Sequence, residues 1–118
     1  MHFVHKNAKT GTLGVLGVFM TPGAANEVFA GLAAAFPAEE GGKRPLEVDP
    51  SGLVPKTLDY WTYEGSLTTP PCSEIVDWMV TREPIEVAAA DIDKFTKLYK
   101  MNARPVLAAN RRFILRSL

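Results

Sequence analysis

The stretch that most constrains the fold is residues 60–78, which reads YWTYEGSLTTPPCSEIVDW. Aromatic residues open it and a run that includes Val76 and Trp78 closes it, and both runs are typical of strands. Between them, Pro70 and Pro71 have no backbone N–H to donate, so this pair cannot lie inside a central strand ladder. The stretch therefore predicts two strands joined by a stiff loop.

The loop between these runs carries two adjacent hydroxyls, Thr68 and Thr69, directly after the apolar Leu67. Residue types alone favour a simple interpretation, in which both threonines are solvated polar residues of a hairpin-like connection. The alternative is a rigid loop that presents a hydroxyl and a backbone N–H to a ligand. The bond before Pro71 is also one of the few positions at which a cis peptide costs little.

The chain has 118 residues, and we expect residues 1–118 to form a single domain. Thirteen basic and thirteen acidic side chains cancel. This balance argues against a nucleic-acid or anionic-membrane partner, because both require a basic surface. No apolar run approaches the length of a membrane span, and Met1 is not followed by the regions of a signal peptide.

Nine prolines and nine glycines indicate short elements separated by many turns. Alternation predicts a strand over residues 1–7, and the nearly continuous apolar run over residues 12–20 predicts a central strand that is covered on both faces. Thr21 fits the N-cap of a first amphipathic helix, which Pro37 ends.

The remaining segments complete a strand-rich pattern. Residues 45–55 predict a short strand and a turn, residues 88–99 a second amphipathic helix, and residues 111–118 a final strand. Because strands and helices do not alternate regularly, this order predicts a mixed α/β fold that is rich in β, with a sheet and peripheral helices.

Two histidines near the start, His2 and His5, have a spacing that suggests a metal site. Residues three apart on a strand point to opposite faces, so both cannot bind one ion. For each of them alone, a hydrogen-bonded structural role is the commoner one. By contrast, Val4 lies two residues from His2 and therefore shares its face.

The single cysteine, Cys72, cannot close a disulfide within this chain. Three interpretations remain: a small buried apolar side chain, a free thiol, or one half of a bridge to a segment that is absent here. Composition favours the first.

Several segments together resemble the α-class carbonic anhydrases of bacterial type. The run GSLTTPPCSE at residues 65–74, followed by V-x-W, is similar to the signature loop of that family. The same holds for the opening MHFVHKN, the central TLGVLGVFM, and NARPVLAANRR near the end. The resemblance covers essentially the whole chain, as the C-terminal part of that fold. It implies a central, twisted, mostly antiparallel sheet with peripheral helices.

The resemblance also implies a cofactor and a reaction. The family, a standard example of a catalytic zinc site, holds zinc with three histidines and a water, and the bound hydroxide attacks carbon dioxide to give bicarbonate. His2 matches the third zinc ligand. Thr68 matches the threonine that accepts the hydroxide's hydrogen bond, and its N–H would bind substrate. The apolar wall on which carbon dioxide would rest matches Val4, Val15, Leu67, Val76 and Trp78.

Further roles follow from the same resemblance. Thr69 lines the pocket, and the backbone carbonyl of Asn102 supports another ligand. The Pro70–Pro71 bond is cis in the family. Cys72 matches a cysteine that bacterial members often bridge to an N-terminal partner, and this makes the bridge to an absent segment the favoured interpretation.

This sequence also departs from the family pattern. The first two zinc-ligand histidines, in an H-x-H strand, belong to a part of the family that precedes Met1. We therefore expect an incomplete C-terminal part of the enzyme that is inactive alone. The alternative is a non-catalytic binding or oligomerising module, in which another copy or the missing N-terminal segment covers the open sheet edge. Bacterial members are periplasmic or secreted, and Cys72 fits an oxidising compartment.

Overall fold

The computed structural model describes residues 1–39, 41–98 and 101–118. Two compact units divide the chain. The first comprises Met1–Phe19, Lys56–Glu83 and Ala103–Leu118, and the second Met20–Pro55 and Pro84–Asn102. No helix in the described residues has both the length and the apolar composition that crossing a membrane requires. That residues 1–118 form a single domain stays a prediction.

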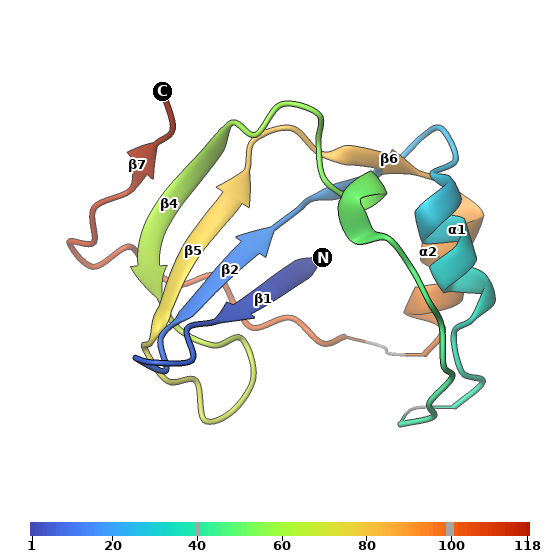
Figure 1. Cartoon of the computed structure of the whole chain (residues 1–118), viewed down its shortest axis with the longest axis horizontal. Helices are drawn as coiled ribbons and strands as arrows, with labels where there is room; N and C mark the ends of the chain where they lie inside the picture. The colour runs from blue at the N-terminus through green and yellow to red at the C-terminus, as the bar shows by residue number, and fades with distance from the viewer. Residues whose placement is uncertain (40, 99–100) are drawn as a thin grey trace. The chain divides into compact units, whose positions relative to one another are not determined.

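The first unit is built on a five-stranded sheet (Figure 1). Its strands lie in the order β1-β2-β5-β4-β7. Three pairings are antiparallel, and the pairing of β2 with β5 is parallel. The expected fold class, a β-rich mixed fold with a mostly antiparallel sheet, is confirmed. The strands are β1 (His2–Lys6), β2 (Leu13–Gly17), β4 (Tyr60–Gly65), β5 (Val76–Thr81) and β7 (Leu115–Arg116).

Strand register gathers the apolar side chains on one face of this sheet. Val15 lies opposite both Val4 of β1 and Trp78 of β5, and Trp78 lies opposite Tyr63 of β4. Directly opposed residues share a face, so these side chains form one layer. Val15, Val76 and Trp78 are buried in it, and each contributes about 1.5–3 kcal/mol through burial.

The final strand is shorter than the sequence predicts. Residues 111–118 contain only the two-residue β7, and Phe113 is 86% exposed. Positive φ angles of 49° at Asn110 and 65° at Arg111 put a turn where the strand was expected to begin. The run of apolar residues at 113–115 was thus misleading, because the local backbone conformation takes precedence over it.

An ionic cluster around Asp59 fastens β7 to the sheet. The Asp59 carboxylate accepts hydrogen bonds from Arg82, from Arg116 at 3.1 Å and from the Ser117 hydroxyl at 3.1 Å. The Ser117 hydroxyl in turn accepts a hydrogen bond from the Tyr60 amide at 2.9 Å. The bond from Arg116 is the main cause that lowers the pKa of Asp59 below its ordinary value of 3.8, and partial burial opposes it.

This lowered pKa predicts a loss of stability in acid. Because the folded state holds the Asp59 proton less tightly than the unfolded state, the stabilising contribution is complete above about pH 4 and is lost as the pH falls through the folded-state pKa. Asp59→Asn is expected to remove this part of the pH dependence. Urea unfolding of both proteins at pH 7 and pH 3 measures it, and an equal loss in the variant contradicts the prediction.

Thr81, at the end of β5, has a buried hydroxyl with no hydrogen-bond partner among the described residues. A buried polar group without a partner costs free energy. Thr81→Val keeps the shape and removes the hydroxyl, so we expect the free energy of unfolding to rise by about 1 kcal/mol. Urea denaturation checks this, with the exposed Thr57→Val as the control that leaves it unchanged. A fall in stability in Thr81→Val refutes the prediction.

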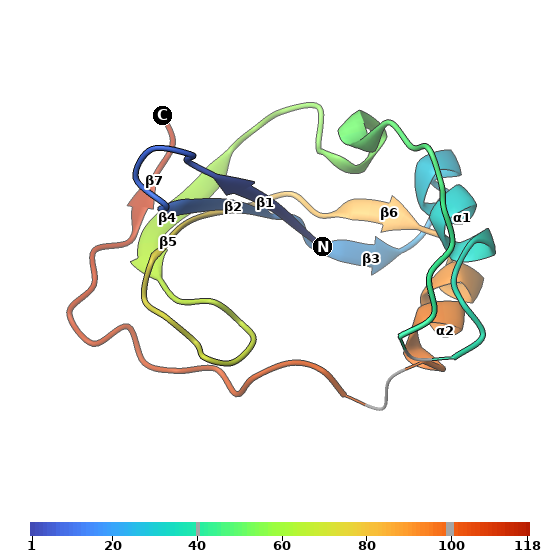
Figure 2. The same cartoon turned by 60° about the horizontal axis from the view of Figure 1, so that its bottom comes forward.

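The second unit comprises a two-stranded parallel sheet, β3 (Met20–Pro22) with β6 (Ile85–Val87), the helices α1 (Glu27–Ala34) and α2 (Ala89–Thr96), and the short 3₁₀ helix η1 (Pro50–Leu53) (Figures 1 and 2). Aromatic rings join the two α-helices. The rings of Phe36 and Phe95 lie 5.7 Å apart, and those of Phe29 and Phe36 lie 6.4 Å apart.

Two features of this unit differ from the sequence prediction. Thr21 is not the N-cap, because it lies in β3, and the Asn26 side chain caps α1 by accepting from the Phe29 amide at 3.0 Å. Instead of a strand, residues 45–55 contain η1, which the Asp49 carboxylate caps through the Ser51 amide at 2.9 Å. The predicted end of the second helix, residue 99, lies outside the described residues.

Candidate functional site

Strand β1 places His2 and Val4 on the apolar face of the sheet. His2 lies opposite Gly17 of β2, and Val4 lies opposite Val15. Since Gly17 has no side chain, the imidazole can extend across β2 and reach the neighbouring strand β5. There the His2 ring meets the Trp78 ring edge to face, with centroids 4.9 Å apart and planes at 73°.

The environment of His2 favours its neutral form. Part of the side chain is exposed, but desolvation of the imidazole lowers its pKa, and the neighbouring N-terminal ammonium lowers it further. That ammonium donates a hydrogen bond to the Val18 carbonyl at 2.7 Å. A neutral imidazole offers a free nitrogen lone pair, the form in which histidine binds metals.

An apolar wall stands beside the imidazole. Val15, Val76 and Trp78 are buried, and Leu67 packs against them from the loop between β4 and β5. Val4 extends this wall at its open end, where it is 60% exposed. The structure therefore brings His2 and all five predicted wall residues to one face of the first unit.

The loop over residues 66–75 is fixed by backbone hydrogen bonds. The Leu67 amide donates to the Ser73 carbonyl at 3.0 Å, and the Cys72 amide donates to the Thr69 carbonyl at 2.9 Å. The Trp78 indole N–H donates to the Ser66 carbonyl at 3.0 Å. The Pro70–Pro71 bond is cis, as the resemblance implies.

Thr68 and Thr69 lie exposed at the tip of this loop, directly after Leu67. Both residues are therefore accessible to a ligand, and Thr68 adjoins Leu67, which packs on the wall. Cys72 is a free, half-buried thiol with a φ of 59°. Asn102 belongs to the second unit and is exposed. The structure thus joins the wall, His2 and the loop within the first unit, and the role of Asn102 stays a prediction.

Sequence reasoning missed Ser66 and Arg104. The Arg104 guanidinium donates to the Ser66 hydroxyl at 3.1 Å and to the Leu67 carbonyl at 3.0 Å. The segment NARPVLAANRR, which contains Arg104, was noted for its family resemblance, but it predicts no regular element. Nothing in that pattern indicates which loop the arginine contacts.

The described residues do not form a closed metal site by themselves. Among residues 1–39, 41–98 and 101–118, no group of three or more His, Cys, Asp or Glu side chains could hold a metal ion. His5 does not join His2, because its neighbours place it on the other face and its Nδ1 lies 3.1 Å from the Phe3 carbonyl oxygen. A zinc ion at His2 therefore requires further ligands.

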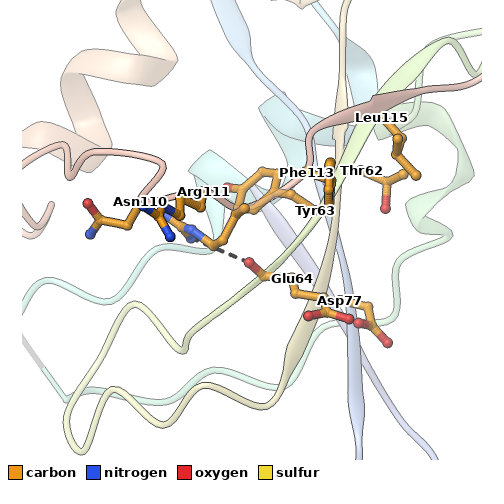
Figure 3. A pocket seen from close by; sticks show the side chains of 9 residues that line it. Thr62, Tyr63, Glu64, Asp77, Asn110, Arg111, Phe113 and Leu115 are labelled. Atoms are coloured by element: carbon orange, nitrogen blue, oxygen red, sulfur yellow. Dashed lines mark hydrogen bonds between the residues drawn. The ribbon is translucent and has the colours of Figure 1, made fainter.

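A cavity of about 550 Å³ is lined by residues of β4, of β5 and of the C-terminal segment (Figure 3). Its lining includes Glu64 and Asp77, which lie directly opposite each other on β4 and β5. Both alternate with the wall residues along their strands, so they belong to the opposite face of the sheet. None of the predicted site residues lines this cavity.

The chain matches known proteins over almost its whole length. The family model described as "Eukaryotic-type carbonic anhydrase" matches residues 1–116. The chain is 40% identical to a carbonic anhydrase of Nostoc sp., in an alignment 121 residues long that covers 100% of this chain and 46% of the relative. It is also 40% identical to a carbonic anhydrase of Klebsiella pneumoniae over 118 residues, 98% of this chain and 48% of the relative.

Solved structures of carbonic anhydrases also match this chain. The α-carbonic anhydrase from Thermovibrio ammonificans, in complex with the inhibitor sulfanilamide, superposes with a TM-score of 0.90 at 43% identity, over 96% of this chain and 51% of that one. A carbonic anhydrase from Chlamydomonas reinhardtii, in complex with acetazolamide, superposes with a TM-score of 0.86 at 38% identity. The match covers 99% of this chain and 56% of that one. The chain spans about half the length of the curated relatives that it matches.

Proposed function

Because this chain belongs to the eukaryotic-type carbonic anhydrase family, we propose that it supplies one side of a site that hydrates carbon dioxide to bicarbonate. The observation that carries the proposal is the contact between His2 and Trp78, which puts a neutral imidazole against the apolar wall. The family is generally zinc-dependent, and His2 would be the ligand that this chain contributes.

The other residues have separate tasks in this proposal. The wall formed by Val4, Val15, Leu67, Val76 and Trp78 excludes water and accommodates an apolar gas molecule. Thr68 supplies a hydroxyl and a backbone N–H at the edge of that wall, where they can orient and bind a polar or anionic group. Thr69 borders the same space, and the carbonyl of Asn102 would support a ligand.

We propose that the chain alone does not catalyse the reaction. One imidazole forms only a small part of the three-ligand set that a catalytic zinc requires. The remaining ligands would come from the half of the relatives that this chain does not match, either as a further segment or as a separate partner. The alternative that stays open is a non-catalytic binding module, and the absence of a closed ligand set among the described residues favours it.

A covalent chimaera tests the proposal directly. In it, the unmatched N-terminal half of the Nostoc carbonic anhydrase precedes this chain. We expect one zinc ion per molecule and carbon dioxide hydration that acetazolamide inhibits, whereas the 118-residue chain alone shows neither. His2→Ala in the chimaera is expected to remove most of the zinc. A folded chimaera without zinc or hydration contradicts the enzyme proposal and leaves the binding module.

We propose that the partner segment, or a second copy, covers the β1 edge of the sheet. In the described residues, β1 pairs only with β2, and its other edge is open. Open edges pair readily with further strands. Sedimentation of the chain alone and of the chimaera checks this, and a well-folded monomeric chain counts against it.

We also propose a periplasmic or secreted location, where Cys72 would form a disulfide with a segment outside this chain. Support comes from the free thiol, which is half-buried in the loop rather than enclosed in the core. Thiol titration of the protein isolated from its source cells tests the pairing. A fully reactive Cys72 contradicts it.

A further inference from the structure

Arg104 connects the C-terminal segment to the loop that carries Thr68. One of its guanidinium nitrogens, Nη1, lies 3.1 Å from the Ser66 hydroxyl and 3.0 Å from the Leu67 carbonyl oxygen. The segment that follows residue 103 runs alongside this loop (Figure 2). Pro105 restricts the backbone of Arg104 to extended conformations, which reduces the entropy lost when the side chain binds.

The acceptor that matters is the Leu67 carbonyl. It belongs to the same planar peptide group as the Thr68 N–H, and in a trans peptide these two point in opposite directions. A cation that holds the carbonyl therefore fixes the direction of the Thr68 N–H. It also polarises the peptide group, which strengthens that N–H as a donor.

Other hydrogen bonds fix the same two residues, Ser66 and Leu67. The Ser66 hydroxyl donates to the Leu67 carbonyl at 3.1 Å, so it shares this acceptor with Arg104. The Ser66 carbonyl accepts from the Trp78 indole at 3.0 Å, and this bond connects Ser66 to the ring that contacts His2. Arg104 thus completes a set of hydrogen bonds around the peptide that precedes Thr68.

We propose that Arg104 is a positioning residue for Thr68, which orients and polarises the Thr68 N–H toward the substrate space. The importance of that N–H rests on the proposed function, whereas the effect on the loop does not. Arg112 provides the matched control. It lies in the same C-terminal segment and donates to the Ala108 and Ala109 carbonyls at 3.0 and 2.8 Å. It also reaches β4, through the Glu64 carbonyl at 3.4 Å and the Tyr63 ring, but it makes no hydrogen bond to residues 66–75.

Amide hydrogen exchange and nitrogen-15 NMR of the full 118-residue chain test the positioning. In Arg104→Met, we expect the Leu67 amide and the Trp78 indole N–H to exchange about tenfold faster, and the Thr68 amide resonance to move. Arg112→Met is expected to leave all three unchanged. Arg104→Lys keeps a cation that can reach the carbonyl, so it should recover part of the effect.

Two results overturn the inference. One is unchanged Thr68 and Leu67 signals in Arg104→Met, and the other is an equal change in Arg112→Met, which would indicate general loosening of the segment. If Arg104→Met does not fold, Arg104→Gln carries the test, because a Thr68 resonance identical to the wild type in this uncharged variant contradicts orientation by the guanidinium charge.

Activity in the chimaera is the second readout. We expect Arg104→Met to lower carbon dioxide hydration about tenfold, Arg104→Lys to recover most of it, and Arg112→Met to change it less than about twofold. An inactive parent chimaera refutes the proposed function, and the exchange measurements still decide the role of Arg104. An active parent whose rate Arg104→Met does not change refutes the role in catalysis.

Discussion

Gly65→Ala is expected to lower the free energy of unfolding by about 1–3 kcal/mol, because the site has no room for one more methyl group. A Cβ at residue 65 would lie 2.8 Å from Cδ1 and 3.2 Å from Nε1 of Trp78, and 3.2 Å from Cε2 of Tyr63. The indole cannot move away easily, since it is buried and donates to the Ser66 carbonyl. Urea denaturation followed by circular dichroism measures the loss.

Gly31→Ala in α1 is the matched control for this prediction. A Cβ there meets nothing within 4 Å, and alanine favours a helix, so we expect a gain of about 0.5–1 kcal/mol. The Gly65 variant should also change the near-ultraviolet spectrum of Trp78. If Gly65→Ala is as stable as the wild type, the close packing of Gly65 against the indole is incorrect.

Thr68→Val should lower carbon dioxide hydration by the chimaera about 100-fold, with little effect on stability. The side chain is exposed at the loop tip, so its loss removes no core packing. Removal of one well-placed hydrogen-bonding group from a catalytic site costs about 10²–10³ in rate. Stopped-flow hydration measurements with a pH indicator give the rate, and zinc content confirms that the metal is retained.

Thr57→Val is the control for this variant, because Thr57 is an exposed threonine outside the site loop. We expect it to leave the rate within about twofold of the parent, as is usual for surface substitutions. A Thr68→Val rate as high as that of Thr57→Val would show that the Thr68 hydroxyl takes no part in the reaction. The proposed role would then be restricted to the backbone N–H, which valine retains.

The strands were predictable where side-chain period and burial agree. Residues 2–6 alternate and form β1, and the apolar run before Met20 forms the central β2. The prediction failed where a long-range strand pairing determines the boundary. Thr21 and Asn26 are both good N-caps, and only the pairing of β3 with β6 decides between them. That pairing joins segments far apart in the sequence, and side-chain patterns do not reveal it.

The site was predictable in part for the same reason. The period of two alone places Val4 beside His2, and the family resemblance adds the wall and the loop. The contact of His2 with Trp78 depends on the register of three strands, since β1 reaches β5 only across β2. The Arg104 contact depends on the path of an irregular segment, for which no periodic signal exists. The catalytic roles of His2 and Thr68 stay predictions.

The parallel pairing of β2 with β5 has a consequence for synthesis on the ribosome. Strands β1 and β2 are adjacent in sequence, so this hairpin can form early, but β5 begins only at Val76. During translation of the intervening residues, the inner edge of β2 and the apolar face around Val15 remain uncovered. Nascent chains that end before Val76 are therefore prone to aggregation, and their uncovered apolar face offers a binding surface to a chaperone.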